Sequence, residues 1–432
     1  MFWEKEIETA PLADLKRLQL NRLKKTLRQA GKSPAYAKTF KTHKVSLDRI
    51  KSLDDIRRLP FTSKEDLRQH FPYGFVAVPP EKLVRVHSSS GTTGRATAVF
   101  HTSKDLAAWA NLIARCMYMV GVRRGDVFQN IVGYGLFTGG LGFHYGAELL
   151  GALTIPAGAG NSKRQISLMR DFGTTVFHII PSYALHLWKV FGELNLDPKK
   201  DTRLRIALIG AEPHSDATRQ RIEEMYGVSA FNSYGLSEMN GPGVAFECPE
   251  KSGMHFWEDD FYVEVIDPKT LKVLPDGEEG ELVYTTLNRE AMPLIRYRSK
   301  DLAAIFSGPC RCGRTHRRIS RIKGRSDDMF ILKGVNIFPL QIDTVLMNVA
   351  EVGTNYQVVL EREDFEDRMI VKVEVRPELF TGDLRQLENL RRRLTESLKS
   401  ELLVTPKVEL VEPDSLPKSE GKAVRVVDRR EM

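Results

Sequence analysis

Short apolar runs alternate with amphipathic segments through the middle of the chain. The runs lie at 126–132, 151–157, 174–180, 204–210 and 228–234. The segments at 162–172, 182–194 and 214–226, which lie between some of these runs, read as helices. Such alternation requires crossover connections and predicts a mostly parallel sheet covered by helices on both faces. The loops at the carboxyl ends of those strands are the expected ligand site.

The pattern changes twice toward the C-terminus. Alternating strands around the turn-rich "PDGEEG" predict antiparallel hairpins over 258–306. After 324–328, a short helix at 340–349 precedes strands at 355–363 and 368–377, a charged helix at 384–402 and a strand at 407–413. We therefore expect an α/β fold in which a large N-terminal domain, 1–325, has mostly parallel sheets and a β-rich subregion. A small α+β domain, 326–432, follows a short linker.

Composition limits the possible partners. The 432 residues are 42% hydrophobic with a net charge of +8, and the basic residues are scattered. This charge favours a solvated surface or attraction for a polyanionic small molecule, and we expect no nucleic acid. Charge, Gly or Pro interrupts every apolar run, and "MFWEKEIETA" lacks a basic-then-apolar start. We expect a cytoplasmic protein without a membrane partner.

The stretch "SSSGTTG" contains the strongest local signal. Its hydroxyls and backbone N–H groups are donors, and its glycines allow the backbone to turn tightly around an anion. A phosphate group is the expected guest, although the same composition suits a flexible surface loop. The stretch comprises Ser88, Ser89, Ser90, Gly91, Thr92, Thr93 and Gly94.

The order of further motifs resembles that of the adenylate-forming superfamily of acyl-CoA synthetases and luciferases. "SSSGTTGRAT" is similar to its phosphate loop, "GAEP" to its adenine-flanking loop and "NSYGLSE" to its aromatic and metal-binding motif. "YRSKDLA" resembles its ribose-binding motif, "GRSDDM" its hinge and "PKSEGKAVRV" its terminal lysine motif. Within the superfamily, "YGLFTGGLGFHYGAELLGA" and "GRSDDMFILKGVNIFPLQI" resemble the phenylacetate-CoA ligases.

That resemblance implies a two-step reaction. ATP and an aryl carboxylate such as phenylacetate form an acyl-adenylate and pyrophosphate, and the thiol of coenzyme A then displaces AMP. It also implies a catalytic role for Lys422, Mg²⁺ binding by Glu238 and a mobile C-terminal domain with its hinge at Asp327. The remaining ATP-binding residues that it implies are Ala211, Glu212, Pro213, Asn232, Ser233, Tyr234, Gly235, Ser237, Asp301 and Arg325.

The segment "GYGLFTGGLG" is the expected acyl pocket. Tyr134 and Phe137 offer aromatic surface, and Gly139 and Gly140 would let a flat ring approach the backbone. An arylacetate is the expected substrate.

Four soft or borderline ligands form two short clusters. Cys248 and His255 lie in "CPEKSGMH", and Cys310 and Cys312 in "CRC". Three thiols and one imidazole suit a closed tetrahedral Zn²⁺ site of structural type. Free buried thiols are the alternative.

Two other activities remain open at this stage. One is a nucleotidyl transferase of the coenzyme F390 synthetase type, and the other is an adenylating enzyme that loads a carrier protein. The family resemblance also favours a homodimer.

Overall fold

The computed structural model describes residues 1–89, 96–363, 366–379, 384–417 and 425–430. The chain divides into two compact units. The first unit contains Met1–Gly158, Thr174–His178 and Phe231–Ile322. The second contains Ala159–Gly173, Ile179–Ala230 and Lys323–Met432. No helix of the described ranges has the length and apolarity that a membrane span requires.

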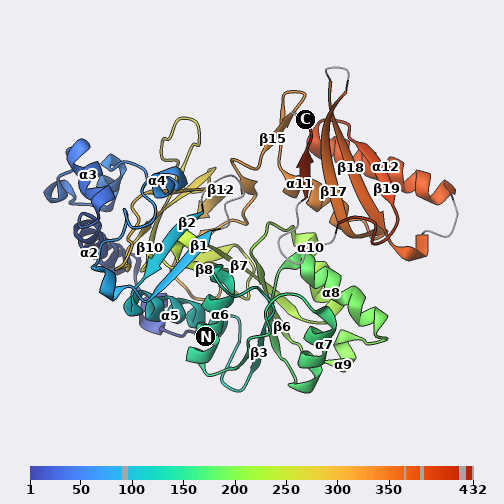
Figure 1. Ribbon diagram of the computed structural model, residues 1–432, viewed down its shortest axis with the longest axis horizontal. Helices are drawn as coiled ribbons and strands as arrows, with labels where there is room; N and C mark the ends of the chain where they lie inside the picture. Colours follow the sequence, from blue (N-terminus) through green and yellow to red (C-terminus); the bar gives the residue numbers. More distant parts are fainter. Residues whose placement is uncertain (90–95, 364–365, 380–383, 418–424, 431–432) are drawn as a thin grey trace. The chain divides into compact units, whose positions relative to one another are not determined.

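Parallel strands form one part of the first unit. β3 (Val127–Asn130) pairs in parallel with β4 (Leu153–Ile155) and with β5 (Val176–Ile179). Two helices, α5 (Ser103–Met119) and α6 (Thr138–Leu150), pack against each other beside them (Figure 1). Strand β3 carries its apolar side chains into the core, as its near-continuous burial requires of a covered parallel strand.

Antiparallel strands form the rest of this unit, as the turn-rich sequence predicted. They pair in the order β7-β8-β9-β13-β12-β11-β10. A separate hairpin joins β1 (Arg85–Ser89) to β2 (Thr97–His101). The bounds of the antiparallel strands are β7 Ser229–Leu236, β8 Gly241–Glu247, β9 Met254–Phe256, β10 Phe261–Ile266, β11 Glu279–Thr286, β12 Tyr297–Phe306 and β13 Arg318–Ile319.

The N-terminal segment of the first unit is helical. It contains α1 (Lys5–Glu8), α2 (Leu12–Ala30), α3 (Pro34–Thr42) and α4 (Lys64–Gln69). Two ion pairs fix its start, because Arg314 donates to the buried carboxylate of Glu8 and Arg115 lies between the half-buried Glu4 and the buried Asp259.

The second unit combines a helical segment with the C-terminal α+β domain. Its helical segment contains α7 (Ser162–Asp171), α8 (Pro181–Glu193), α9 (Pro198–Asp201), strand β6 (Ile206–Gly210) and α10 (Asp216–Tyr226). Pro181 begins α8 at a position where its missing N–H costs nothing, and Ser215 caps α10.

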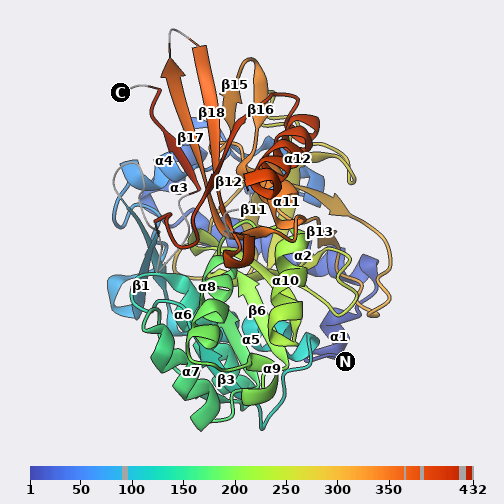
Figure 2. The ribbon, with the colours of Figure 1, turned by 90° about the vertical axis from the view of Figure 1, so that its right-hand side faces the viewer.

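The C-terminal domain is a four-stranded sheet with helices against it. The strand order is β19-β18-β17-β20, and β17 with β18 forms the long hairpin of Figure 2. Leu390, Leu394, Leu398 and Leu402 form one buried stripe of α12 because they recur every four residues. The elements are β15 Phe330–Leu332, β16 Val335–Ile337, α11 Pro339–Met347, β17 Val352–Glu363, β18 Glu366–Val375, α12 Leu384–Leu402, β19 Lys407–Val411 and β20 Val426–Asp428.

Polar contacts hold α10 and α11 together within the second unit. The Asp343 carboxylate accepts hydrogen bonds from the Ser215 backbone N–H at 3.2 Å and from the Thr218 hydroxyl at 2.9 Å. Arg221 donates to the backbone carbonyls of Val349 and Val352. The described helices and strands confirm the sequence-based elements and the predicted α/β class.

Candidate active site

The predicted phosphate loop begins at the tip of the β1–β2 hairpin. Ser88 and Ser89 are the last residues of β1, and the Ser88 backbone N–H donates to the Leu136 carbonyl at 3.0 Å. The hairpin therefore positions the start of the loop beside the segment predicted to bind the acyl group. Predicted residues outside the described ranges are Ser90, Gly91, Thr92, Thr93, Gly94 and Lys422.

Tyr234 and Asp301 lie together in the first unit. The Tyr234 hydroxyl donates to Asp301 Oδ2 at 2.6 Å, although 67 residues separate them in the chain. Both residues are at least nine-tenths buried. Burial and the adjacent Asp301 carboxylate raise the pKa of Tyr234 well above its usual value, so this hydroxyl remains a donor. The contact holds one carboxylate oxygen of Asp301 in a fixed direction.

Glu238 follows β7 in a short 3₁₀ turn, Ser237–Met239. The residue is 4% exposed, and its Oε1 accepts a hydrogen bond from the Thr97 hydroxyl at 3.4 Å. The neighbouring Ser237 hydroxyl contacts the hydroxyl of Thr138 at 3.3 Å. A buried carboxylate beside neutral hydroxyls fits the hard oxygen ligands that Mg²⁺ prefers.

The other residues of this motif have mainly structural contacts. The Asn232 backbone N–H donates to Glu247 at 2.8 Å. The Ser233 hydroxyl is buried and has no hydrogen-bond partner in the described part of the chain. Gly235 is required by packing, since a Cβ atom there would lie 1.8 Å from the Gly241 carbonyl oxygen.

The predicted adenine-flanking residues and the hinge belong to the second unit. Ala211 has a left-handed backbone with φ of 70°, which turns the chain sharply after β6. Glu212 accepts a hydrogen bond from the Ser182 backbone N–H at 2.6 Å, and Pro213 follows it. Arg325 forms a two-point ion pair with Asp327, at 2.9 and 3.0 Å.

A polar network crosses the predicted acyl pocket. The Asn130 side-chain amide donates to the Tyr134 hydroxyl at 2.9 Å and to the Gly140 carbonyl at 2.7 Å. Its oxygen accepts from His178 Nδ1 at 2.9 Å. Burial lowers the pKa of His178 to about 3, so the ring is neutral. Sequence reasoning missed Asn130 and His178 because each lies in a buried strand and belongs to no recognised motif.

The paired glycines of this segment serve the protein's own packing. A Cβ atom on Gly139 would lie 2.5 Å from the Phe137 ring, and one on Gly140 would lie 2.6 Å from the Gly133 carbonyl oxygen. The space that these glycines open is thus occupied by Phe137 and by backbone. Gly139 and Gly140 stay predicted residues of the pocket wall. This packing gives no support to the expectation that they let a flat ring approach the backbone.

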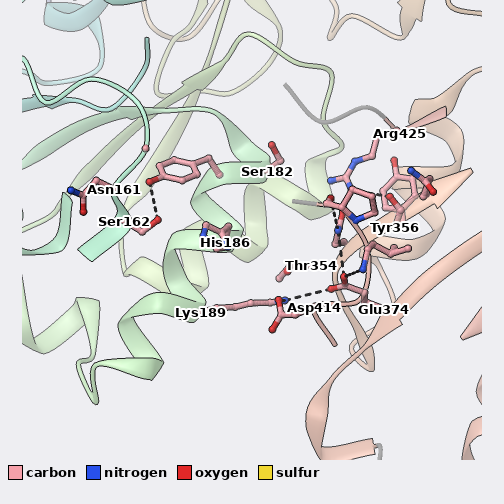
Figure 3. Close-up of a pocket in the computed structure, with 16 residues that line it drawn as sticks. Asn161, Ser162, Ser182, His186, Lys189, Thr354, Tyr356, Glu374, Asp414 and Arg425 are labelled. Carbon is pink, nitrogen blue, oxygen red and sulfur yellow. Dashed lines mark hydrogen bonds and ion pairs between the residues drawn. The ribbon is translucent and has the colours of Figure 1, made fainter. Parts of the chain in front are cut away.

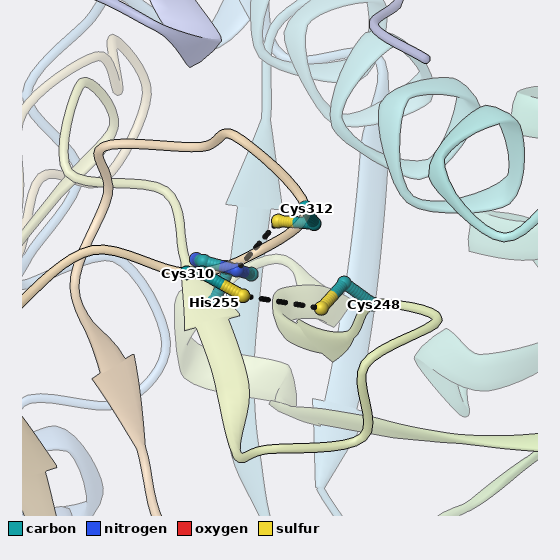
Figure 4. A group of neighbouring side chains, drawn as sticks. All are labelled: Cys248, His255, Cys310 and Cys312. Carbon is teal, nitrogen blue, oxygen red and sulfur yellow. Dashed lines mark hydrogen bonds between the residues drawn. The ribbon is translucent and has the colours of Figure 1, made fainter.

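The four predicted metal ligands converge in the first unit. Their ligand atoms all lie within 4.8 Å of one another, although the two pairs are far apart in the sequence (Figure 4). Cys248 Sγ lies 3.7 Å from Cys310 Sγ, and Cys312 Sγ lies 3.3 Å from His255 Nε2. Pairing of β13 with β9, in which Arg318 lies opposite His255, brings the two halves together.

The surroundings of this cluster suit a cation. The hydrogen bond from Cys248 lowers the pKa of Cys312, and the bond to His255 lowers the pKa of Cys310. His255 Nδ1 donates to the His316 carbonyl at 2.8 Å, which leaves Nε2 aimed at the sulfur atoms. Metal-bound histidines are typically oriented in this way. The donor set therefore fits Zn²⁺. The alternative of free buried thiols does not explain why all four ligand atoms lie within 4.8 Å of one another.

Two family models match the chain. The model described as AMP-binding enzyme covers residues 17–288, and the model described as AMP-binding enzyme C-terminal domain covers residues 334–430. The chain belongs to the AMP-binding enzyme family. This membership and the relatives below confirm the resemblance inferred from the motifs.

Known AMP-binding enzymes are similar to the chain over almost its whole length. Phenylacetate-coenzyme A ligase from Aromatoleum evansii is 45% identical over 428 residues, which are 98% of this chain and 96% of the relative. The phenylacetate-coenzyme A ligase from Escherichia coli K12 is 42% identical, with 98% and 97% covered. A crystal structure of 2-hydroxyisobutyryl-CoA ligase in complex with R3-HIB-AMP superposes with a TM-score of 0.94 at 33% identity, covering 100% of this chain and 93% of that one.

A polar cavity of about 190 Å³ lies within the second unit of this AMP-binding enzyme (Figure 3). Lys189 of α8 forms ion pairs across it with Glu374 at 3.5 Å and Asp414 at 3.1 Å. Arg425 lies over the Tyr356 ring and donates to Asn355 at 2.7 Å. Lys189 and the two carboxylates are thus paired with one another, and no sequence motif had indicated this cavity.

Proposed function

We propose that the protein is an ATP-dependent aryl-CoA ligase. It activates phenylacetate or a related arylacetate as an acyl-adenylate and transfers the acyl group to coenzyme A, with release of pyrophosphate and AMP. The observation that carries this proposal is the near-full-length similarity to phenylacetate-coenzyme A ligases. The convergence of Tyr234 on Asp301 supports it, because a buried, oriented carboxylate is suited to accept hydrogen bonds from ribose hydroxyls.

In the first half-reaction, a carboxylate oxygen of the acid attacks the α-phosphorus of ATP. Negative charge grows on the phosphoryl oxygens and leaves with pyrophosphate, so cationic groups must converge there. We assign Lys422 to the α-phosphate and the substrate carboxylate. Glu238 would hold Mg²⁺, which neutralises phosphate charge when bound. Asp301, oriented by Tyr234, would hold the ribose.

In the second half-reaction, the thiol of coenzyme A attacks the acyl carbon and AMP leaves. Lys422 must then be withdrawn, and we propose that the backbone turns at Asp327. The Arg325–Asp327 ion pair is partly exposed, at 35% and 53% of the side-chain surface, so its loss during such a turn would cost little.

The test is release of pyrophosphate and AMP from ATP and Mg²⁺ across phenylacetate, indoleacetate, benzoate and medium-chain fatty acids. We expect AMP turnover with an arylacetate only when coenzyme A is present. Turnover that ignores coenzyme A and requires a deazaflavin would favour the nucleotidyl transferase. A requirement for an acyl carrier protein would favour the loading enzyme.

We also propose a structural Zn²⁺ held by Cys248, His255, Cys310 and Cys312. Four protein ligands leave no open position, so the ion would stabilise the antiparallel region and take no part in chemistry. Metal analysis of protein purified without added zinc should find about one equivalent per chain. The Cys310→Ser variant should lose most of it, and less than a tenth of an equivalent in the unaltered protein would remove the proposal.

Two properties of the native protein complete this proposal. We propose that it is a homodimer, as the family resemblance implies, and light scattering on the purified protein would measure its mass. We also propose a cytoplasmic location, because ATP and coenzyme A are the co-substrates, and cell fractionation would test it.

A further inference from the structure

The segment 1–9 depends on tertiary contacts for its position. Its helix, α1, has four residues, whereas an isolated helix in water needs roughly 12–15. Helix α5 supplies one set of contacts, since Trp3 Nε1 donates to the Asn111 side chain at 2.8 Å. The loop 307–317, which joins β12 to β13, supplies a second set through residues 314–316. We call this second set of contacts the clasp.

A buried ion pair and two backbone carbonyls form the first part of the clasp. Arg314 Nε donates to Glu8 Oε2 at 2.7 Å, and Arg314 Nη2 donates to the Met1 carbonyl at 2.8 Å. The Thr315 backbone N–H donates to the Glu8 carbonyl at 3.1 Å. Arg314 and Glu8 are both buried, so either charge would be strongly destabilising without its partner. The position of the segment is therefore tied to the position of the loop.

His316 links the clasp to the predicted metal site. The Glu258 backbone N–H donates to His316 Nδ1 at 2.9 Å, so the ring carries its hydrogen on Nε2. That Nε2 donates to the Ile7 carbonyl at 3.0 Å. The His316 carbonyl in turn accepts at 2.8 Å from Nδ1 of His255, one of the four predicted ligands. Two consecutive hydrogen bonds thus connect a metal ligand to the segment 1–9.

The loop 307–317 has no regular structure to hold its own shape. All of this loop is described, and it contains neither helix nor strand. Side-chain contacts must therefore order it. Cys310 and Cys312 lie in the loop, whereas Cys248 and His255 lie at strands β8 and β9 (Figure 4). An ion held by all four ligands would join the loop to these strands.

We propose that the metal site also anchors the segment 1–9. Metal binding orders the loop 307–317, and the ordered loop holds the segment through the clasp. Loss of the ion removes the connection between the loop and the strands, and the clasp then opens. The coupling is reciprocal, so a docked segment must also strengthen metal binding. This inference rests on the proposed Zn²⁺ and is independent of the ligase activity.

The test is hydrogen exchange of the full chain followed by mass spectrometry, with the metal content measured on the same samples. The unaltered protein is compared before and after treatment with a chelator, and with Cys312→Ser, which lacks one ligand. Cys116→Ser is the matched control, because Cys116 is a buried cysteine of the same unit that lies outside the ligand cluster. Exchange in β5 is the internal reference, since its amides open with the fold of the first unit.

The unaltered protein and the control should hold about one equivalent of metal and exchange slowly in residues 3–9. Chelation or Cys312→Ser should accelerate that exchange at least tenfold and leave β5 unchanged. Unchanged exchange in residues 3–9 after loss of the metal would overturn the clasp alone. Equal acceleration in β5 would assign the effect to global unfolding and would also overturn it. An unaltered protein without metal would refute both the Zn²⁺ and this inference.

Discussion

The hydrogen bond between Tyr234 and Asp301 allows the ATP site to be tested with the loss of a single oxygen atom. Tyr234→Phe keeps the aromatic ring and deletes the donor that lies 2.6 Å from Asp301 Oδ2. A hydrogen bond to a charged group is worth about 1.5–3 kcal/mol, and the near-complete burial of both residues limits compensation by water. If that bond orients Asp301 for the ribose, kcat/KM for ATP should fall about 10- to 100-fold.

The assay is ATP–pyrophosphate exchange at saturating acid, with ATP varied and Mg²⁺ in excess. Tyr284→Phe is the matched control, because it removes a fully buried hydroxyl beside the Tyr234 ring and leaves the donor to Asp301 Oδ2 in place. The two rings are 6.3 Å apart, so both substitutions disturb the same region of the core. We expect the control to keep the kcat/KM of the unaltered protein.

Chemical denaturation of both variants separates an effect on the site from an effect on the fold. Tyr234→Phe should lose about 1–3 kcal/mol of stability and remain folded at the assay temperature. A kcat/KM for ATP within twofold of the unaltered protein would refute the argument that this contact orients Asp301. An equal loss in Tyr284→Phe would assign the effect to core packing.

Four further substitutions test the other parts of the proposal. Lys422→Ala should abolish adenylation from ATP yet largely spare thiolation of supplied acyl-adenylate, and equal loss of both half-reactions would remove its assigned role. Cys310→Ser, or chelation of the metal, should lower the melting temperature, because an ion present at 1,000 times its dissociation constant adds about 4 kcal/mol to the free energy of unfolding. An unchanged melting curve in chelator would count against a structural ion. Gly235→Ala should give insoluble or inactive protein, because the added Cβ atom would lie 1.8 Å from the Gly241 carbonyl oxygen. Full activity would show that the backbone can shift to make room for the methyl group. Asp343→Ala should destabilise the second unit by about 1–3 kcal/mol, since two buried donors lose their acceptor. Urea unfolding would measure this loss, with Asp328→Ala as the control.

The periodicity of the chain was sufficient to predict most of its elements. The helices at 162–171 and 181–193 and the strand between them follow from local apolar spacing, from the N-cap Asn161 and from Pro181 at the first helical position. The ATP-site motifs could also be recognised in the sequence, because loops that contact phosphate need glycines and hydroxyls that are contiguous in the chain. Local signals of this kind need no knowledge of which strands are neighbours.

Tertiary structure decided what those motifs contact. The sequence could pair Cys248 with His255 and Cys310 with Cys312, but only the β9–β13 register places all four ligand atoms within 4.8 Å. In the same way, the sequence could not show that the Phe137 ring packs against Gly139 and fills the space that the motif had assigned to the substrate.

The residues that the sequence did not reveal are those whose meaning depends on distant partners. Asn130 and His178 read as ordinary strand residues until the parallel pairing of β3 with β5 aligns them. His101 and Arg289 are 188 positions apart, yet in the fold burial and the nearby Arg289 charge together lower the pKa of His101. The order of local motifs determined the class of chemistry, because each motif acts through adjacent residues. Long-range strand register and burial determined the electrostatics of the site, because pKa values and ion pairs depend on which distant side chains are buried next to one another.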